Sequence, residues 1–240
     1  MKILVLGASG ATGRYLVGQL LIRNQHLKII VRPLASIPDS WITDTRIQII
    51  RTEISEMTSE EATRHTTDCQ AIASCLGHTM SLRGIYGMPH RLVLNTVKLF
   101  CDVVKRKTGR PVKFLLMNTA GYRNEDNNEQ VSALQRIAMA IIRTAIPPHL
   151  DNELAADYLR IEVGKHISAI QWVVIRPDNL TEEGGVSAYD TNTSPVSTLF
   201  RPNKVSRINV AHFMAELITE HHLWERWKGQ MPVISNSSRL

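Results

Sequence analysis

Cysteine, aromatic residues and long apolar runs are all scarce in this chain of 240 residues. The three cysteines, Cys69, Cys75 and Cys101, are odd in number and lack metal-site spacing, which argues against a disulfide framework. No apolar stretch approaches the roughly 18 residues of a membrane-spanning helix, so we expect no membrane association. The first apolar run begins at Lys2, which leaves no room for a signal peptide. These features predict a reducing, cytoplasmic location.

The composition also gives little support for nucleic-acid binding or for a metal site. Aromatic residues make up 5% of the chain and do not alternate with basic residues, so bases would find few rings to stack on. The main basic cluster comprises Lys105, Arg106, Lys107, Arg110 and Lys113. It falls where a helix should end, and cations complement the helix dipole there; a nucleic-acid patch is the alternative. The pair His221-His222 has no carboxylate or cysteine at ligand spacing, so we expect no metal.

Apolar runs alternate with helical patterns along the whole chain. We expect strands over residues 2–6, 27–32, 46–50, 69–77, 112–118 and 170–177, and helices over 12–22, from near Thr58 and over 89–107. The expected strands are continuously apolar, which is typical of a parallel sheet covered on both faces. Since no repeat or composition shift marks a boundary, we expect one α/β domain over residues 1–240. Its doubly wound parallel sheet would bind ligands at the carboxyl ends of the strands.

Two polar loops follow the last two expected strands. Residues 122–130 (YRNEDNNEQ) come after the fifth strand, and residues 182–195 (EEGGVSAYDTNTSP) come after the sixth. Both would open at the edge of the sheet where a substrate binds. They are either mobile lids or merely solvated connections, and the sequence favours neither reading.

The segment LVLGASGATGR (residues 4–14) spaces Gly7, Gly10 and Gly13 three apart, between the first strand and the first helix. Glycine permits positive φ and close backbone approach, and a helix N-terminus offers free N–H groups to a phosphate. A tight turn is the alternative. The flanking strand and helix, and a second strand ending about twenty residues on, favour a dinucleotide site. The expected phosphate contacts are Gly7, Ser9, Gly10, Ala11, Thr12, Gly13 and Arg14.

The residue at the end of the second strand distinguishes NAD from NADP. NAD binders place an acid there for the ribose 2′-hydroxyl, whereas this chain has Arg32 in the segment IIVRP. Together with Arg14, it offers two guanidinium groups for a 2′-phosphate, so we expect NADP(H). A solvated strand end and an exposed helix position are the alternatives for these two residues. The remaining expected cofactor contacts are Glu53 near the adenine and Leu76, Gly77, Asn118 and Pro177 along the ribose and nicotinamide.

The Gly-x-x-Gly-x-x-Gly spacing resembles that of the extended and atypical short-chain dehydrogenase/reductases. So do the segments VR at the end of strand two, NTAGY after strand five and VVIRPDNLT at strand six. Within that branch, residues 146–177 and 204–218 are similar to the flavin reductase/biliverdin-IXβ reductase group and its NmrA-like neighbours. The resemblance covers about residues 2–213. It implies a Rossmann-type fold, and either hydride transfer from NADP(H) or sensing of it.

The Tyr-x-x-x-Lys pair of typical superfamily members is absent, because no tyrosine in the chain has lysine four residues later. That lysine lowers the pKa of the tyrosine, which can then protonate a carbonyl. The resemblance places Thr119 at the position of a substrate-flanking serine, and Tyr158 and Glu162 at positions of flanking histidines. Four residues apart, the last two should share one helix face. We predict all three as catalytic candidates; a packed tyrosine and a solvated glutamate are the alternatives for Tyr158 and Glu162.

The expected function is therefore an NADP(H)-dependent oxidoreductase that passes hydride to a conjugated small molecule, such as a flavin or quinone. A conjugated acceptor delocalises the incoming charge, so that water or a weak donor can supply the proton. The alternative is a non-catalytic NADP(H)-sensing, NmrA-like regulator that acts through a protein partner. The missing tyrosine–lysine pair counts against an epimerase on the same scaffold. His212 is expected to be structural, and the oligomeric state is open.

Overall fold

The computed structural model of the protein describes residues 1–77, 87, 90–127, 129, 143, 147–165, 168–196 and 202–237. The first half of the chain contains β1 (Lys2–Leu6), α1 (Ala11–Ile22), β2 (His26–Val31), α2 (Asp39–Thr43), β3 (Ile47–Arg51), η1 (Ile54–Glu56), α3 (Ser59–Thr66), β4 (Ala71–Ser74), α5 (Leu92–Lys105) and β5 (Val112–Met117). The second half contains η2 (Glu125–Asn127), α7 (Pro147–Asp157), the π-helix η3 (Tyr158–Val163), β6 (Ile170–Pro177), β7 (Asn179–Thr181), β8 (Tyr189–Asn192), β9 (Lys204–Ser206), α8 (Arg207–Thr219), α9 (His221–Trp227) and β10 (Val233–Asn236).

The central sheet has the strand order β3-β2-β1-β4-β5-β6-β10-β8. Its pairs are parallel, except that β8 runs antiparallel to β10 at one edge. A separate two-stranded parallel sheet joins β7 to β9. The chain winds outward from β1 to β3 and then returns to place β4 beside β1, so the carboxyl ends of β1 and β4 form the topological switch point. The predicted doubly wound α/β fold is confirmed.

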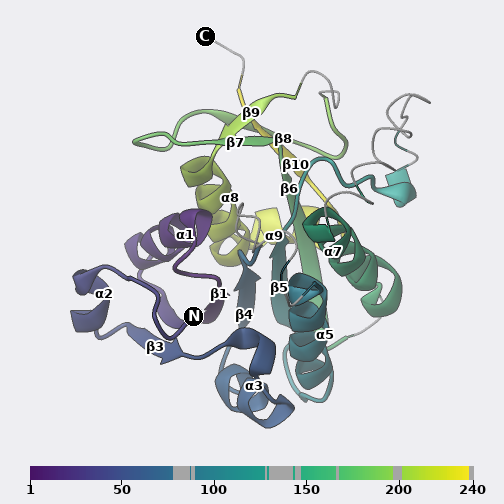
Figure 1. Ribbon diagram of the computed structural model, residues 1–240. Coiled ribbons are helices and arrows are strands. Elements are labelled where there is room, and N and C mark those ends of the chain that lie inside the picture. The colour runs from purple at the N-terminus through teal and green to yellow at the C-terminus, as the bar shows by residue number, and fades with distance from the viewer. Residues whose placement is uncertain are drawn as a thin grey trace.

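Helices cover both faces of the sheet and close two apolar cores (Figure 1). On one face, Leu16 of α1 and Phe213 of α8 pack with Trp224 of α9. On the other face, Phe100 of α5 packs with Leu159 of η3 beneath α7. Burying each such side chain stabilises the fold by about 1.5–3 kcal/mol. In the part of the chain that the structure describes, no helix is both long and apolar enough to cross a bilayer.

Most predicted elements appear within a few residues of their expected bounds. The expected strand over 69–77 is shorter than predicted, because its last residues leave the ladder after Ser74. The helix expected over 89–107 is observed as α5 (Leu92–Lys105), and residue 89 lies outside the described residues. The helix expected near Thr58 begins at Ser59, with Thr58 as its N-cap in a capping box with Glu61. The elements α2, α9, β7, β8 and β10 were not predicted from the sequence.

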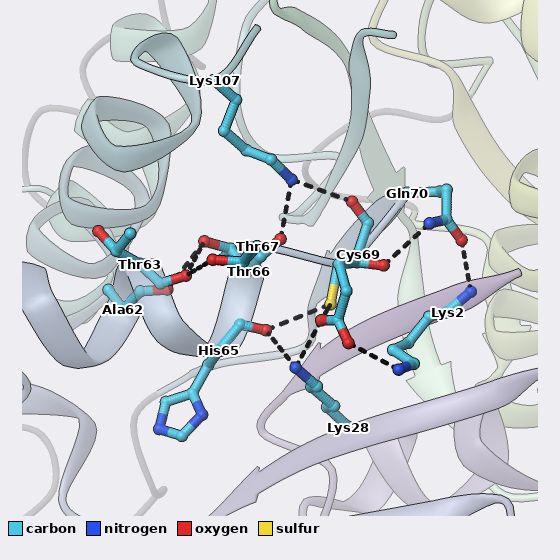
Figure 2. A network of polar contacts seen from close by, with 11 residues as sticks. Lys2, Lys28, Ala62, Thr63, His65, Thr66, Thr67, Cys69, Gln70 and Lys107 are labelled. Atoms are coloured by element: carbon cyan, nitrogen blue, oxygen red, sulfur yellow. Dashed lines mark hydrogen bonds and ion pairs between the residues drawn. The ribbon is translucent and has the colours of Figure 1, made fainter. Parts of the chain in front are cut away.

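The basic cluster at residues 105–113 serves helix ends, as expected, but mostly those of neighbouring helices. Lys107 Nζ donates hydrogen bonds to the carbonyl groups of Thr66 (2.8 Å) and Cys69 (3.3 Å), at the end of α3 (Figure 2). Lys113 Nζ donates to the carbonyl group of Ile218 (2.7 Å), near the end of α8. The carbonyl groups of Thr66 and Ile218 lie in the last turns of α3 and α8, where carbonyl groups lack partners within the helix. The cluster therefore has a structural use in the fold.

A second group of polar contacts joins α3 to the amino-terminal ends of β1 and β2 (Figure 2). The buried Lys28 Nζ lies 2.6 Å from Asp68 Oδ1, and Lys2 Nζ lies 2.6 Å from Asp68 Oδ2. Burial alone would raise the pKa of Asp68. Hydrogen bonds from Lys2 and Lys28 outweigh that effect and lower it to about 2. The ionised carboxylate thus holds the strands and α3 together at the edge opposite the switch point.

Candidate functional site

The three glycines after β1 enclose one carbonyl group at the switch point. Gly7 has φ of +75°, and a Cβ built on it would lie 2.9 Å from the carbonyl carbon of Cys75 at the end of β4. A Cβ built on Gly13 would lie 2.1 Å from the Gly7 oxygen, and one on Gly10 would lie 3.1 Å from it. Any side chain at Gly13 would therefore push α1 away from the β1 loop. The geometry explains why glycine stands at these positions.

The loop delivers the N-terminus of α1 to the same point. Gly10 is the N-cap of α1, and no side chain caps the helix there. The amide N–H of Gly10 donates to the Gly7 carbonyl group (3.0 Å), which closes the turn. The first N–H groups of a helix have no intrahelical partner, so those of Ala11 and Thr12 are available to a phosphate. The buried Thr12 and half-buried Ser9 lie on either side of Gly10 in the chain.

Arg14 and Arg51 hold the loop that follows β2. The Arg14 guanidinium donates to the carbonyl group of Ser36 (2.6 Å), and also to that of Ser9 (3.0 Å). The Arg51 Nη1 donates to the carbonyl groups of Pro33 (3.0 Å) and Ala35 (3.1 Å). Both guanidinium groups are therefore engaged with the backbone and fix the shape of the loop. Arg51 was not among the predicted site residues, because only the pairing of β2 with β3 brings it near its partner carbonyl groups.

Arg32 stands at the start of that loop with a different environment. Its side chain is exposed, and its guanidinium makes no hydrogen bond or ion pair with any residue that the structure describes. Glu53, expected near the adenine, is also exposed and precedes η1. A cleft of about 180 Å³ opens beside it, between η1 and the first turns of α5. The Arg32 guanidinium could therefore bind a ligand without breaking the hydrogen bonds that hold this loop.

The expected ribose and nicotinamide contacts lie at the carboxyl ends of three adjacent strands. Leu76 and Gly77 follow β4, Asn118 follows β5, and Pro177 ends β6. The buried Asn118 side chain donates to the carbonyl group of Asn152 on α7 (2.7 Å) and accepts from the Thr119 amide (2.9 Å). It therefore fixes the β5 loop against α7. The fold places these residues in one row that continues from the glycine loop.

Thr119, the first catalytic candidate, lies in this row. Its Oγ1 accepts a hydrogen bond from the amide of Gly121 (3.2 Å). A Cβ built on Gly121 would lie 3.6 Å from Thr119 Oγ1 and 3.2 Å from Nε2 of His149 on α7. The Thr119 hydroxyl and the His149 imidazole thus both border the position that a side chain at Gly121 would take. His149 was not among the predicted site residues.

Tyr158 and Glu162 lie away from Thr119 and Gly121. The Tyr158 hydroxyl lies 3.1 Å from both Lys105 Nζ and Asp102 Oδ1, in the last turn of α5. Because α5 leads into β5, its last turn lies at the amino-terminal edge of the sheet, opposite Thr119. Burial raises the pKa of Tyr158 despite the hydrogen bond from Lys105, so its proton is held more tightly than usual. The contact with Lys105 thus does not reproduce the missing tyrosine–lysine acid.

Tyr158 and Glu162 lie on a π-helix. Residues Tyr158–Val163 form this element, in which hydrogen bonds run from residue i to i+5. The amide of Gly164, for example, donates to the carbonyl group of Leu159 (3.0 Å). Glu162 is exposed and Tyr158 is half-buried, so the two side chains have different environments.

The two polar loops are tied to one buried guanidinium. Arg176 of β6 is fully buried, and its Nη2 lies 2.7 Å from Glu129 Oε1 in the loop over 122–130. The same nitrogen donates to the carbonyl group of Thr193 (3.0 Å) in the loop over 182–195. These contacts anchor both segments to β6. Residues 128 and 130 lie outside the described residues.

Comparisons with known proteins agree with this geometry. Residues 7–221 match the family described as NAD(P)H-binding. A search of curated protein sequences finds no match. Among solved structures, the chain is similar to a candidate NADH-flavin reductase from Streptococcus pneumoniae TIGR4, with 16% identity, a TM-score of 0.68, and 99% of this chain and 100% of that chain covered.

Two further solved structures show the same fold. A short-chain dehydrogenase/reductase from Veillonella parvula DSM 2008, in complex with NADP, has 15% identity and a TM-score of 0.70 over 99% of this chain and 95% of that one. A candidate NAD-dependent epimerase/dehydratase from Bacillus halodurans has 17% identity and a TM-score of 0.68 over 99% and 94%. At these identities the likeness concerns the fold alone. The family match, in contrast, spans the glycine loop and six of the eight strands of the central sheet, and the chain belongs to the NAD(P)H-binding family.

Proposed function

We propose that the protein is an NADP(H)-dependent oxidoreductase that transfers hydride to a conjugated small-molecule acceptor, such as a flavin or a quinone. The observation that carries this proposal is the glycine loop. A Cβ at Gly13 would fall 2.1 Å from the Gly7 oxygen, so the loop can only form without side chains there. The loop sits at the switch point of a doubly wound sheet, where dinucleotides bind. In this position the free amides of α1 would hold the pyrophosphate.

The preference for NADP(H) over NAD(H) rests on the loop after β2. No acid stands at the end of β2, and the exposed Arg32 takes that position. Arg14 and Arg51 hold the loop backbone, so the Arg32 guanidinium can meet a 2′-phosphate with little reorganisation. Charge-assisted bonds from arginine to phosphate are among the stronger hydrogen bonds in proteins. The Veillonella parvula structure, which contains NADP, supports this preference by fold analogy.

The acceptor class follows from what lies at the nicotinamide end of the row. The Thr119 hydroxyl is present there, while the described tyrosines do not supply an activated acid. A bound NADPH would supply hydride, and the residues around Thr119 would orient the acceptor and exclude water. An acceptor whose conjugated rings spread the added charge makes the smallest demand on this site. The name of the Streptococcus pneumoniae protein, an NADH-flavin reductase, agrees with this class.

Steady-state oxidation of NADPH in the presence of FMN, menadione or dichlorophenolindophenol tests the proposal. We expect turnover with at least one of these acceptors, and weaker turnover with NADH. Tight binding of NADP(H) without turnover on any acceptor would contradict the enzyme and favour the sensing alternative. Absence of NADP(H) binding would contradict both.

A further inference from the structure

His149 places an imidazole beside the predicted reaction centre. It lies in the first turn of α7, and its Nε2 faces Gly121, close to the Thr119 hydroxyl. Its side chain is 17% exposed, so most of the ring is buried. The ring nitrogen on this side is where a proton could be passed to a ligand.

The other ring nitrogen faces a buried carboxylate. His149 Nδ1 lies 3.5 Å from Oε1 of Glu153, one helical turn further along α7. The Glu153 side chain is 6% exposed, and its Oε2 lies 2.6 Å from Nε of Arg143. Neither His149 Nδ1 nor Glu153 Oε1 has a hydrogen-bond partner among the described residues. A buried carboxylate that is left partly unsatisfied is costly, which suggests that the pair is kept for chemistry.

A second histidine in the same chain shows what a structural pair looks like. His212 lies 3.4 Å from Glu216, also one turn along its helix, on α8. There, however, the ring nitrogen lies 2.8 Å from the Tyr189 hydroxyl, which also donates to Glu216 (2.7 Å). The hydrogen-bonding capacity of that imidazole is used within the protein, as expected from the sequence. His149 differs because its Nε2 faces Gly121 and its Nδ1 has no hydrogen-bond partner among the described residues.

We propose that His149 donates the proton that completes reduction of the acceptor, and that Glu153 is a positioning residue that orients its imidazole. This inference rests on the proposed function. Hydride addition from NADPH would leave a negative charge on a conjugated oxygen or nitrogen of the acceptor. The Nε2–H bond of His149 breaks, its electron pair stays on the ring, and the proton bonds to that atom. NADPH is oxidised by two electrons, the acceptor is reduced by two, and water returns the proton to the imidazole.

Substitution of the two histidines, each in turn, tests the proton donor. His149→Gln should lower kcat with FMN or menadione by roughly 10²-fold, the usual scale of general-acid catalysis, while the Kd for NADPH stays unchanged. His212→Gln removes a comparable half-buried histidine with a glutamate neighbour, and should leave kcat unchanged. A His149→Gln enzyme that keeps the wild-type kcat would overturn the inference while leaving the proposed function intact. A wild-type protein that turns over no acceptor would instead remove the proposed function, and the inference with it.

The pH profile of kcat/KM tests the positioning role of Glu153. This test does not require the His149→Gln variant to fold. Burial lowers the pKa of His149, the Glu153 carboxylate opposes this, and the Arg143 charge adds to the lowering. These two charged groups are the ones that face the imidazole from the described elements; Thr119 and Gly121 are neutral. The activity of a protonated donor falls as pH rises through its pKa. Glu153→Gln should therefore move this fall to lower pH, and Arg143→Gln should move it to higher pH.

Profiles that coincide for the wild type, Glu153→Gln and Arg143→Gln would overturn the positioning role. A purely structural role for Glu153 would lower the melting temperature without moving the profile. A nitrogen NMR titration of His149 provides a readout without turnover. We expect its Nε2 resonance to shift on addition of oxidised NADP together with FMN, whereas the His212 resonances stay in place. Unmoved His149 resonances at saturating ligand would contradict the inference.

Discussion

Three arginines around one loop show how identical side chains take different tasks. Arg14 and Arg51 donate to backbone carbonyl groups, whereas Arg32 makes no polar contact with a described residue. The sequence could indicate Arg14 and Arg32, because they follow the glycine motif and a strand directly. It could not indicate Arg51, since its partner carbonyls belong to a loop that only the pairing of β2 with β3 brings near. His149 escaped notice for the same reason: its neighbours at Gly121 and Thr119 come from another element.

Arg32→Ala should weaken NADPH binding by roughly 10- to 100-fold, the scale of one lost charge-assisted interaction. NADH binding should change little, because NADH has no 2′-phosphate. Arg64→Ala removes an exposed arginine from α3 and is the matched control for net charge. Fluorescence titrations with both dinucleotides measure the effect. Equal losses for NADPH and NADH in the Arg32 variant would contradict the assignment.

Because of Asp68, the free energy of unfolding should depend on pH in the acidic range. Its pKa in the folded protein is about 2, below the ordinary value of 3.8. A lowered pKa stabilises the fold above pH 3.8, and this contribution is lost as pH falls from that value toward 2. Urea unfolding of the wild type and Asp68→Asn should therefore differ at pH 5 and converge near pH 2. A difference that stays constant over this range would show that the carboxylate charge is not responsible.

At the scale of elements, the first helix is positioned by glycine. A Cβ built on Gly13 would collide with the Gly7 oxygen. A Cβ built on Gly18, later on α1, would meet nothing within 4 Å outside its own helix backbone. Both residues are glycines of α1, but only Gly13 lies against the loop that follows β1. Their substitution separates a general effect of alanine in a helix from a specific effect on the cradle.

Gly13→Ala should lower the free energy of unfolding by about 1–3 kcal/mol, because the methyl group overpacks the contact with Gly7. It should also abolish detectable NADPH binding. Gly18→Ala should instead raise stability by about 0.5–1 kcal/mol, since alanine is the better helix former. Thermal melts and NADPH titrations of both variants provide the comparison. Normal NADPH affinity in Gly13→Ala would rule out the cradle as the phosphate site.

Elements with a clear local pattern of apolar residues were predicted from the sequence, and elements without one were not. The strands β1 to β6 are mostly apolar in sequence, and all six were predicted within a few residues of their observed bounds. β8 (Tyr189–Asn192) is short and largely polar, and it pairs with a strand more than forty residues away. β10 (Val233–Asn236) has four residues, and its apolar start is too brief to distinguish a strand from a turn. The π-helix η3 has no distinct sequence pattern, so it was not predicted.

For the whole molecule, Arg176 links the sheet to both loops over the site. The guanidinium is fully buried and bonds to Glu129 and to the carbonyl group of Thr193. Both loops were predicted from the sequence, but Arg176 was not predicted to join them. An arginine within a strand is usually expected to face solvent. A buried charge deprived of its partner is much more costly than an exposed one.

Arg176→Met should lower the free energy of unfolding by about 3–5 kcal/mol, because Glu129 would be left buried without its partner. The control is the exposed pair Lys228–Glu225, with a distance of 2.6 Å and side chains 40% and 43% exposed. Lys228→Met should cost about 0–1 kcal/mol. Chemical denaturation measures both. Similar small costs for the two variants would mean that the buried pair does not anchor the loops.

Equilibrium titration of the wild-type protein with NADPH and with NADH decides whether the glycine loop is a dinucleotide site. We expect saturable binding of one dinucleotide per chain, with NADPH bound more tightly than NADH. If neither dinucleotide binds, the proposed site is wrong.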